Sequence, residues 1–461
     1  MNALQQYIDL YRDHGELLRS RSCPLLNAPR EEAFCKLQSM SLPRKGNENY
    51  EHTDLEELLA PDYALNIARV PLDVNPQATF RCDVPNLSTA LFMLLNDQWA
   101  ETENSRRQLP EGVIVESLAR AAQSRPELVG KYYNTLADGD NPLVALNTML
   151  VQDGLFIYVP KGVRLEKPLQ LVDILQYEVP LLAARRMLIV VDDDAEAKLL
   201  VCDHTQNPDA RLMSLQTVEI MTGRNARFDF YDLEESTEMT TRLSSLYLRQ
   251  GAGSNVLIDG ITLFNGTTRN EYYCRLPEPD AELHLYGMGI EDRSRRLDTY
   301  SLISHEAERC HTDELFKYVV DEASTGAFSG RIYVAPGAQK TEAYQANRNI
   351  VGSEQARMFS KPQLEIYADD VKCSHGSAIG QLDAAQVFYM RTRGVPEATA
   401  RMLLKQAFMA DVIEGVRLPA LKDRLRQLVE MRFSGASGAC SACHSECSRQ
   451  GLGDHPGGEI G

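Results

Sequence analysis

Residues 255–287 read NVLIDGITLFNGTTRNEYYCRLPEPDAELHLYG and contain the pattern that decides the fold class. In the closing segment AELHLYG, Ala281, Leu283 and Leu285 share one face of an extended chain, while Glu282 and His284 share the other. Such alternation is typical of a β-strand with one buried face. We therefore expect strands, not helices, in this part of the chain.

Similar short apolar segments recur between residues 141 and 382 with no helical pattern between them. They are LFIYV from Leu155, LQLVDIL from Leu169, MLIVV from Met187, KLLVC from Lys198 and ARFDFYD from Ala226. This spacing predicts an all-β architecture, either a sandwich or a stacked β-solenoid. No strict repeat motif is visible, and the spacing alone does not choose between the two.

Helical spacing is found on both sides of this region. Residues 1–140 are predicted to be mainly helical, and Ser88 is expected to cap one of these helices; strand-like interruptions such as Ala78–Asp83 are left unassigned. The apolar residues that indicate helices here are Leu4, Tyr7, Ile8, Tyr11, Leu91, Leu94 and Leu95. Residues 383–433 are predicted to form three helices, the first capped by Asp383, the second beginning at Pro396 and the third at Pro419.

The composition limits the class of protein. A chain of 461 residues with 43% hydrophobic content is expected to fold into two or three domains. Its formal net charge of −17 argues against a general binder of nucleic acid or of anionic membranes. The amino terminus lacks the apolar region of a signal peptide, and the run Met187–Val191 is too short to span a bilayer. We therefore expect a cytoplasmic protein.

Ten cysteines occur without a regular spacing, so free and mostly buried thiols are the expectation in a reducing compartment. Those read as packing residues are Cys23, Cys35, Cys82, Cys202, Cys274 and Cys310. Cys310 has His305 and His311 close by, and a metal site there is the alternative interpretation. Spacing alone does not show the convergence that a metal requires.

One segment places a thiol beside an imidazole. It reads LEIYADDVKCSHGSAIGQLDAAQVFYMRTRG over residues 364–394, and Cys373 and His375 would share a face of a strand. Both are ligand types for soft or borderline metals and for iron–sulfur clusters. If Asp369 and Asp370 form a turn that shifts the alternation, both residues face the core; otherwise both face outward. A buried cysteine and a structural histidine are the competing interpretation.

The tail, residues 434–461, is rich in Gly and Ser and contains the run CSACHSEC. The run predicts a zinc or cluster site made by Cys440, Cys443, His444 and Cys447, against the alternative of a flexible tail whose thiols bind metal adventitiously. The Cys-x-x-Cys-His sequence also matches a haem attachment motif, but that chemistry requires export from the cytoplasm.

No motif for independent catalysis is present. The chain has no phosphate-binding GxxxxGK[ST] loop, and GAGSN at Gly251 lacks the context of a dinucleotide loop, so any ATP hydrolysis must come from a partner. It also lacks HExxH and GxSxG. A polysaccharide-active enzyme on a β-helix is the alternative, although it would need aromatic platforms and export, and Trp99 is the only tryptophan.

Three segments carry a resemblance to a known family. They are LPRKGNENYEHTDL at residues 42–55, ALNTMLVQDGLFIYVPKGV at 145–163, and QKTEAYQANRN with KPQLEIYADDVKCSHG and GQLDAAQVFYMRTRG within 339–394. Together they resemble the SufB/SufD family of iron–sulfur cluster assembly subunits, and its SufD branch most closely. The likeness covers roughly residues 40–430.

The resemblance implies a right-handed parallel β-helix between helical terminal regions, which favours the solenoid over the sandwich. It also implies a scaffold that is not an enzyme and that works with a SufB-like paralogue and a SufC-like ATPase. The ATPase would bind residues 383–433, and a cysteine desulfurase or sulfur carrier would act through the complex. His375, with Cys373 as a second candidate, would lie where a nascent iron–sulfur cluster forms between the two paralogues. A purely structural partner without metal chemistry is the remaining alternative.

Overall fold

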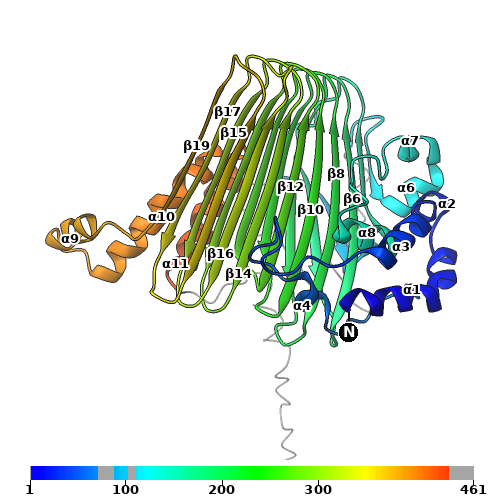
Figure 1. The fold of residues 1–461 in the computed structure, drawn as a ribbon, viewed down its shortest axis with the longest axis horizontal. Coiled ribbons are helices and arrows are strands. Elements are labelled where there is room, and N and C mark those ends of the chain that lie inside the picture. Colours follow the sequence, from blue (N-terminus) through cyan, green and yellow to red (C-terminus); the bar gives the residue numbers. More distant parts are fainter. Residues whose placement is uncertain (1, 71–87, 102–108, 436–461) are drawn as a thin grey trace, which may run out of the picture.

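The middle of the chain forms a parallel β-solenoid of about eight turns (Figure 1). The structure is a computed structural model that describes residues 2–70, 88–101 and 109–435. From β4 onward, successive strands alternate between a nine-stranded and a ten-stranded sheet, so each turn adds one strand to each sheet. Neighbouring strands are parallel except in the pairs β1–β2 and β3–β4. The solenoid interpretation is therefore confirmed over the sandwich.

The nine-stranded sheet has the order β18-β16-β14-β12-β10-β8-β6-β4-β3. Its strands are β3 (Ile114–Ser117), β4 (Asp153–Val159), β6 (Leu181–Val191), β8 (Leu212–Thr222), β10 (Thr240–Gln250), β12 (Thr267–Leu276), β14 (Arg296–His305), β16 (Thr325–Val334) and β18 (Arg357–Ile366).

The ten-stranded sheet has the order β19-β17-β15-β13-β11-β9-β7-β5-β1-β2. Its strands are β1 (Ala90–Leu95), β2 (Gln98–Ala100), β5 (Leu169–Leu175), β7 (Glu196–Thr205), β9 (Arg227–Glu235), β11 (Asn255–Phe264), β13 (Glu282–Glu291), β15 (His311–Val320), β17 (Glu342–Val351) and β19 (Lys372–Gly380).

Side-chain alternation builds the interior of the solenoid. Leu199, Phe230, Ile258 and Leu285 are register partners on four successive strands of one sheet, and all four lie in the apolar core between the two sheets. The parallel register keeps inward positions stacked on inward positions. A strand therefore needs only alternating apolar residues, which explains why the sequence shows no strict repeat motif.

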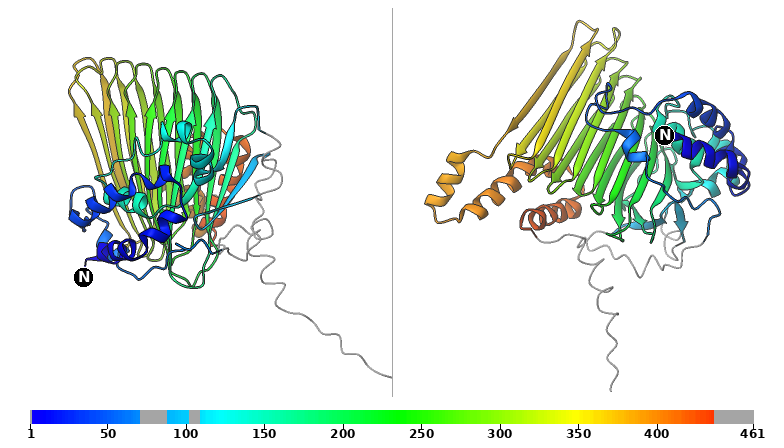
Figure 2. Two further views of the ribbon diagram at one scale, coloured as in Figure 1. Left: turned by 90° about the vertical axis from the view of Figure 1, so that its right-hand side faces the viewer. Right: turned by 60° about the horizontal axis from the view of Figure 1, so that its bottom comes forward.

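Helices cover the outer faces of both sheets (Figures 1 and 2). The amino-terminal group packs on the nine-stranded sheet at its early strands, and the carboxy-terminal helices α10 and α11 pack on the ten-stranded sheet. The helices are α1 (Ala3–Ser20), α2 (Pro24–Asn27), α3 (Arg30–Ser39), α4 (Leu55–Leu59), α6 (Leu118–Ser124), α7 (Pro126–Gly130), α8 (Pro142–Leu150), α9 (Ala384–Thr392), α10 (Glu397–Gly415) and α11 (Pro419–Phe433). None of these helices, in the part of the chain that the structure describes, has the length and apolar character needed to cross a membrane.

Several local predictions are confirmed. The predicted apolar face of the first helix is buried in α1, and the Asp383 side chain caps α9 by accepting a hydrogen bond from the Ala385 N–H. The predicted helix from Pro419 is α11, whose Leu421 and Leu425 are buried. The apolar faces of α10 and α11 pack mainly against the outer face of the ten-stranded sheet, beside Leu257 and Ile261, and not only against each other.

Two local predictions are wrong. The residues after Ser88 form strand β1, not a helix, because Ala90–Leu95 pairs in parallel with β5 and is buried on both faces. A six-residue apolar run satisfies either periodicity, so only the neighbouring strand decides. Cys35 is exposed on α3, whereas Cys23, Cys202, Cys274 and Cys310 are buried as predicted. Ala78–Asp83, Cys82 and the tail lie outside the described residues.

Asp259 gives a stability prediction. It is fully buried on the outward face of β11, and burial raises its pKa to about 8. The folded chain therefore keeps the proton that the unfolded chain releases near pH 4, so stability falls as the pH rises from about 4 to 8. We expect Asp259→Leu to stabilise the chain, with an advantage that grows by up to about 4 kcal/mol between pH 5 and pH 8.

Chemical denaturation of the full chain at several pH values measures this difference. The control is Asp209→Leu, because Asp209 is exposed in a loop. An Asp259→Leu profile that runs parallel to the parent profile across this pH range would contradict the prediction.

Candidate functional site

The candidate pair lies on β19, which is the last strand of the ten-stranded sheet. Cys373 is the register partner of Ala343 and His375 is the register partner of Gln345, and both of these β17 residues are buried in the solenoid interior. The bend at Asp369 and Asp370 shifts the alternation, so Cys373 packs against the interior cluster. The first of the two predicted orientations is therefore the observed one.

The two side chains differ in exposure. Cys373 is half-buried, while His375 is exposed because no described strand pairs with β19 beyond it. Burial raises the pKa of the Cys373 thiol. Since the thiolate is the nucleophile and the metal ligand, Cys373 is the less reactive of the pair in this conformation. His375 needs no rearrangement to reach a ligand.

Behind His375 lies a chain of buried polar side chains that was not predicted from the sequence. The Gln345 side chain donates from Nε2 to Glu314 Oε2 at 2.6 Å, and the Ser301 hydroxyl donates to Glu314 Oε1 at 2.5 Å. Burial raises the pKa of Glu314 to about 7. The sequence does contain polar residues at inward-facing positions of the strands 311–320 and 342–351. Only the register between these two strands shows that the polar side chains meet.

The last turn of the solenoid has unpaired strand edges. Within the described residues, β18 and β19 each pair with one neighbouring strand, so their outer backbone groups have no strand partner. Several large apolar side chains are exposed around these edges: Tyr344, Phe359, Ile366, Tyr367 and Ile379. An apolar surface with free strand edges is suited to pairing with another chain.

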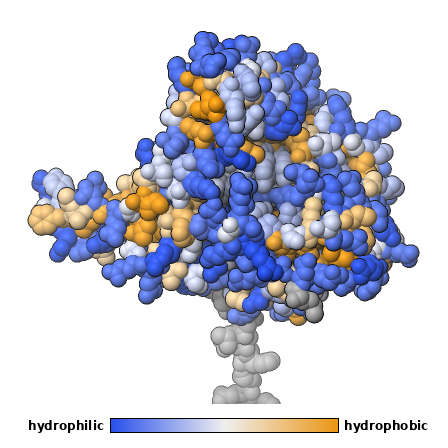
Figure 3. Space-filling model, in the orientation of Figure 1, coloured by the Kyte–Doolittle hydropathy of each residue, from blue (hydrophilic) through white to orange (hydrophobic). Residues whose placement is uncertain are grey.

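A second apolar surface lies on the carboxy-terminal helices. Helix α9 and the start of α10 project from the end of the solenoid, and apolar side chains gather there (Figures 1 and 3). Phe388 is 66% exposed, and Tyr389 and Leu403 are also exposed. Exposure of adjacent large aromatic side chains is uncommon unless a partner covers them.

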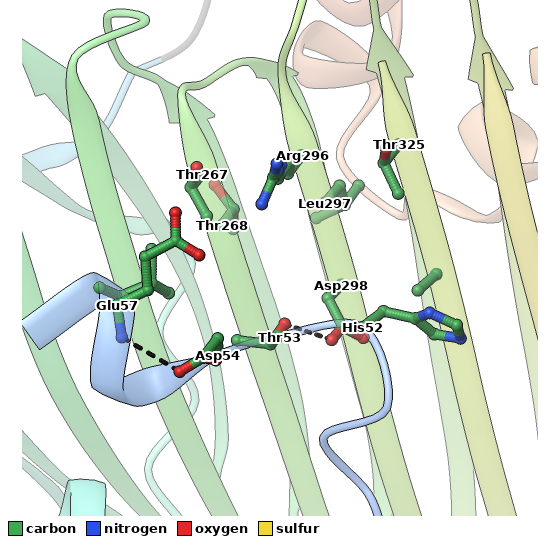
Figure 4. A pocket seen from close by; sticks show the side chains of 12 residues that line it. His52, Thr53, Asp54, Glu57, Thr267, Thr268, Arg296, Leu297, Asp298 and Thr325 are labelled. Carbon is green, nitrogen blue, oxygen red and sulfur yellow. Dashed lines mark hydrogen bonds between the residues drawn. The ribbon is translucent and has the colours of Figure 1, made fainter. Parts of the chain in front are cut away.

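The amino-terminal segment 47–54 crosses the outer face of the nine-stranded sheet (Figure 1). Tyr50 donates to Glu271 at 2.6 Å, and the Arg269 guanidinium lies 4.6 Å from the centre of the Tyr50 ring and 2.8 Å from Asp298. Thr53 donates to Asp298, and a small pocket with both polar and apolar lining residues opens beside this contact (Figure 4). A buried ion-pair network therefore holds the segment in place.

The tip of this segment reaches the last turn. His52 stacks on Phe359 of β18 with ring centres 3.9 Å apart, and Glu51 forms an ion pair with Lys361. Burial lowers the pKa of His52, which favours the neutral ring in this contact. The segment therefore supports the strand whose edge is open.

The predicted alternative metal site at Cys310 is not formed. His305 is buried and its pKa is lowered to about 3 by burial, while Cys310 is buried and donates to the Glu278 carbonyl at 3.4 Å. Over the ranges that the structure covers, no group of three or more His, Cys, Asp and Glu residues could hold a metal ion. Cys440, Cys443, His444 and Cys447 lie outside those ranges, and their predicted site stays a prediction.

Two family models match the chain along most of its length. Residues 1–171 match the SufBD protein N-terminal region, and residues 176–408 match the SufBD core domain of the SUF system for FeS cluster assembly. The chain belongs to the SufB/SufD family. The open strand edges and the Cys373–His375 pair thus lie inside the matched core of this family.

Relatives support the same assignment. The chain is 26% identical to the iron–sulfur cluster assembly protein SufD of Escherichia coli over 449 residues, which covers 95% of this chain and 98% of that protein. It is 29% identical over 411 residues to an iron–sulfur cluster assembly SufBD family protein of Synechocystis, covering 87% and 90% of the two chains. It is 26% identical over 382 residues to SufD of Bacillus subtilis. A role in iron–sulfur cluster assembly follows from membership of the SufB/SufD family.

Proposed function

We propose that this chain is a non-enzymatic scaffold on which iron–sulfur clusters are built together with a SufB-like paralogue and a SufC-like ATPase. The observation that carries the proposal is the open last turn, where His375 and the half-buried Cys373 lie beside unpaired strand edges. The paralogue would pair with these edges, and the nascent cluster would be a transient cargo shared across the junction. A cysteine desulfurase or sulfur carrier would supply sulfur through the complex.

The energy source would be external. The sequence has no phosphate-binding loop, so a partner must hydrolyse ATP. We propose that the ATPase binds the projecting helices and that its nucleotide-driven movement shifts them and the adjoining last turn, which increases access to Cys373. The free buried thiols, such as Cys274, favour a cytoplasmic location, because reduced cysteines persist there.

The decisive experiment is anaerobic co-purification of the full chain with its candidate partners, followed by iron, sulfide and zinc analysis of the complex. The proposal requires that an ATPase and a paralogous chain co-elute and that the complex carries iron and sulfide. A chain that elutes alone and free of metal when both partners are co-expressed would contradict it. Zinc in the complex that disappears with the tail would support the separate prediction for residues 434–461.

The ATPase surface can be tested by one substitution. Phe388→Asp places a charge in the exposed aromatic patch of α9, so we expect affinity for the ATPase to fall at least tenfold, or about 1.4 kcal/mol. Isothermal titration with the purified ATPase measures this loss. The control is Gln386→Asp, because Gln386 is exposed on the same helix and introduces the same charge. Equal affinities of the two variants would place the ATPase elsewhere.

A further inference from the structure

Three successive strands place a carboxyl, an amide and an imidazole in one row. Glu314 of β15 is the register partner of Gln345 of β17, and Gln345 is the register partner of His375 of β19. The preceding partner in the row is Leu285, so the polar part of the row begins at Glu314 and ends at the open edge. Parallel in-register strands keep these side chains about 5 Å apart.

The Gln345 side chain is buried, and only one end of its amide forms a hydrogen bond. Its Nε2 donates to Glu314, which also receives the Ser301 hydroxyl, so the carboxylate fixes which end of the amide faces β15. Its Oε1 is buried and has no hydrogen-bond partner among the described residues. A buried carbonyl oxygen without a partner costs about 1–3 kcal/mol, so a donor on a neighbouring side chain that turns toward this oxygen is favoured.

The geometry of a primary amide indicates where that donor must be. The oxygen and nitrogen diverge from one carbon, so an amide whose nitrogen points to β15 directs its oxygen away from β15. The strand on the other side is β19, and its register partner is His375. Gly330 provides the room for this orientation, because a methyl group at that position would lie 2.4 Å from Gln345 Nε2.

We infer that Gln345 is a positioning residue for His375: its Oε1 accepts a hydrogen bond from the imidazole N–H and leaves the other ring nitrogen free to bind iron at the open edge. Histidines that bind metals commonly donate their second N–H to a fixed acceptor, which sets the tautomer and the orientation of the ring. Glu314 and Ser301 hold the amide, and through it the ring. This inference deepens the proposed function and rests on it for the identity of the ligand.

The test does not depend on a cluster or a partner. In the full chain labelled with ¹⁵N-histidine, NMR distinguishes the two neutral tautomers, and His375→Asn assigns the signal. We expect the neutral ring of His375 to be a single tautomer. Gln345→Leu should produce a mixture of both tautomers, whereas Gln345→Glu keeps an acceptor and should retain one. Gln363→Leu on β18 is the control, because Gln363 is exposed.

Each outcome decides the inference. A mixture of tautomers in the unsubstituted chain, or a single tautomer in a folded Gln345→Leu variant, would overturn it. If Gln345→Leu does not fold, a mixture of tautomers in the unsubstituted chain or in Gln345→Glu would still overturn the inference. In the assembled complex, Gln345→Leu should lower iron loading about tenfold. Because the NMR result needs only the isolated chain, a failure of this inference is distinct from a failure of the scaffold proposal.

Discussion

A complex containing His375→Ala is expected to assemble normally and to load at least about tenfold less iron and sulfide than the unsubstituted complex. His375 is exposed on the edge strand β19, so its removal leaves no cavity in the interior and should not unfold the last turn. The lost group is the one imidazole in the row that ends at the open edge. Anaerobic reconstitution with iron, sulfide and ATP, followed by absorbance and metal analysis, measures the effect.

Two companion variants sharpen this result. Ser374→Ala is the matched control, since Ser374 is the exposed neighbour on the opposite face of the same strand, and we expect full loading. Cys373→Ser should cause a smaller loss than His375→Ala, because Cys373 is half-buried and its pKa is raised by burial. Full cluster assembly by a complex containing His375→Ala would contradict the proposed site. It would favour the alternative that this chain is a purely structural partner without metal chemistry.

The largest loss of stability is expected from Arg242→Met. Arg242 is buried in the solenoid interior, where it lies 3.1 Å from Asp203, forms an ion pair with Asp232 and donates to Asn270 at 2.8 Å. Asp203 also pairs with Arg185, so these charges connect the two sheets across the interior. Removing Arg242 leaves the buried carboxylate of Asp232 without its ion-pair partner and takes one of two cations from Asp203, which costs about 3–5 kcal/mol.

Strand β10 offers an internal control for this prediction. Arg249 on the same strand pairs with Glu278 at 2.9 Å, but both side chains are about 40% exposed. Such surface pairs contribute about 0–1 kcal/mol, so Arg249→Met should change the melting temperature little. Adding Asp232→Leu to Arg242→Met should recover part of the lost stability, because it removes the buried carboxylate that has lost its ion-pair partner. Equal melting temperatures for Arg242→Met and Arg249→Met would contradict the assignment.

More of the fold than of the candidate site could be predicted from the sequence. Alternation in segments such as AELHLYG was enough to predict strands over the middle of the chain, and helical spacing was enough to predict α1, α9 and α11. The short run at Ala90–Leu95 was misassigned, because six apolar residues satisfy either period and its pairing with β5 lies about 80 residues away. Strand identity is a local property, whereas strand pairing is not.

The geometry of the candidate site was predicted only in part, for the same reason. The two-residue spacing of Cys373 and His375 determined that they share a face of a strand, since side chains alternate along any extended chain. Sequence alone left open whether that face is inward or outward, and it gave no indication that Glu314 and Gln345 stand behind the imidazole. These facts depend on register between strands about thirty residues apart and on β19 being the last strand of its sheet. Local sequence determines which way neighbouring side chains point relative to each other, but only the packing of the turns decides what they meet, because contacts between turns are set by long-range register.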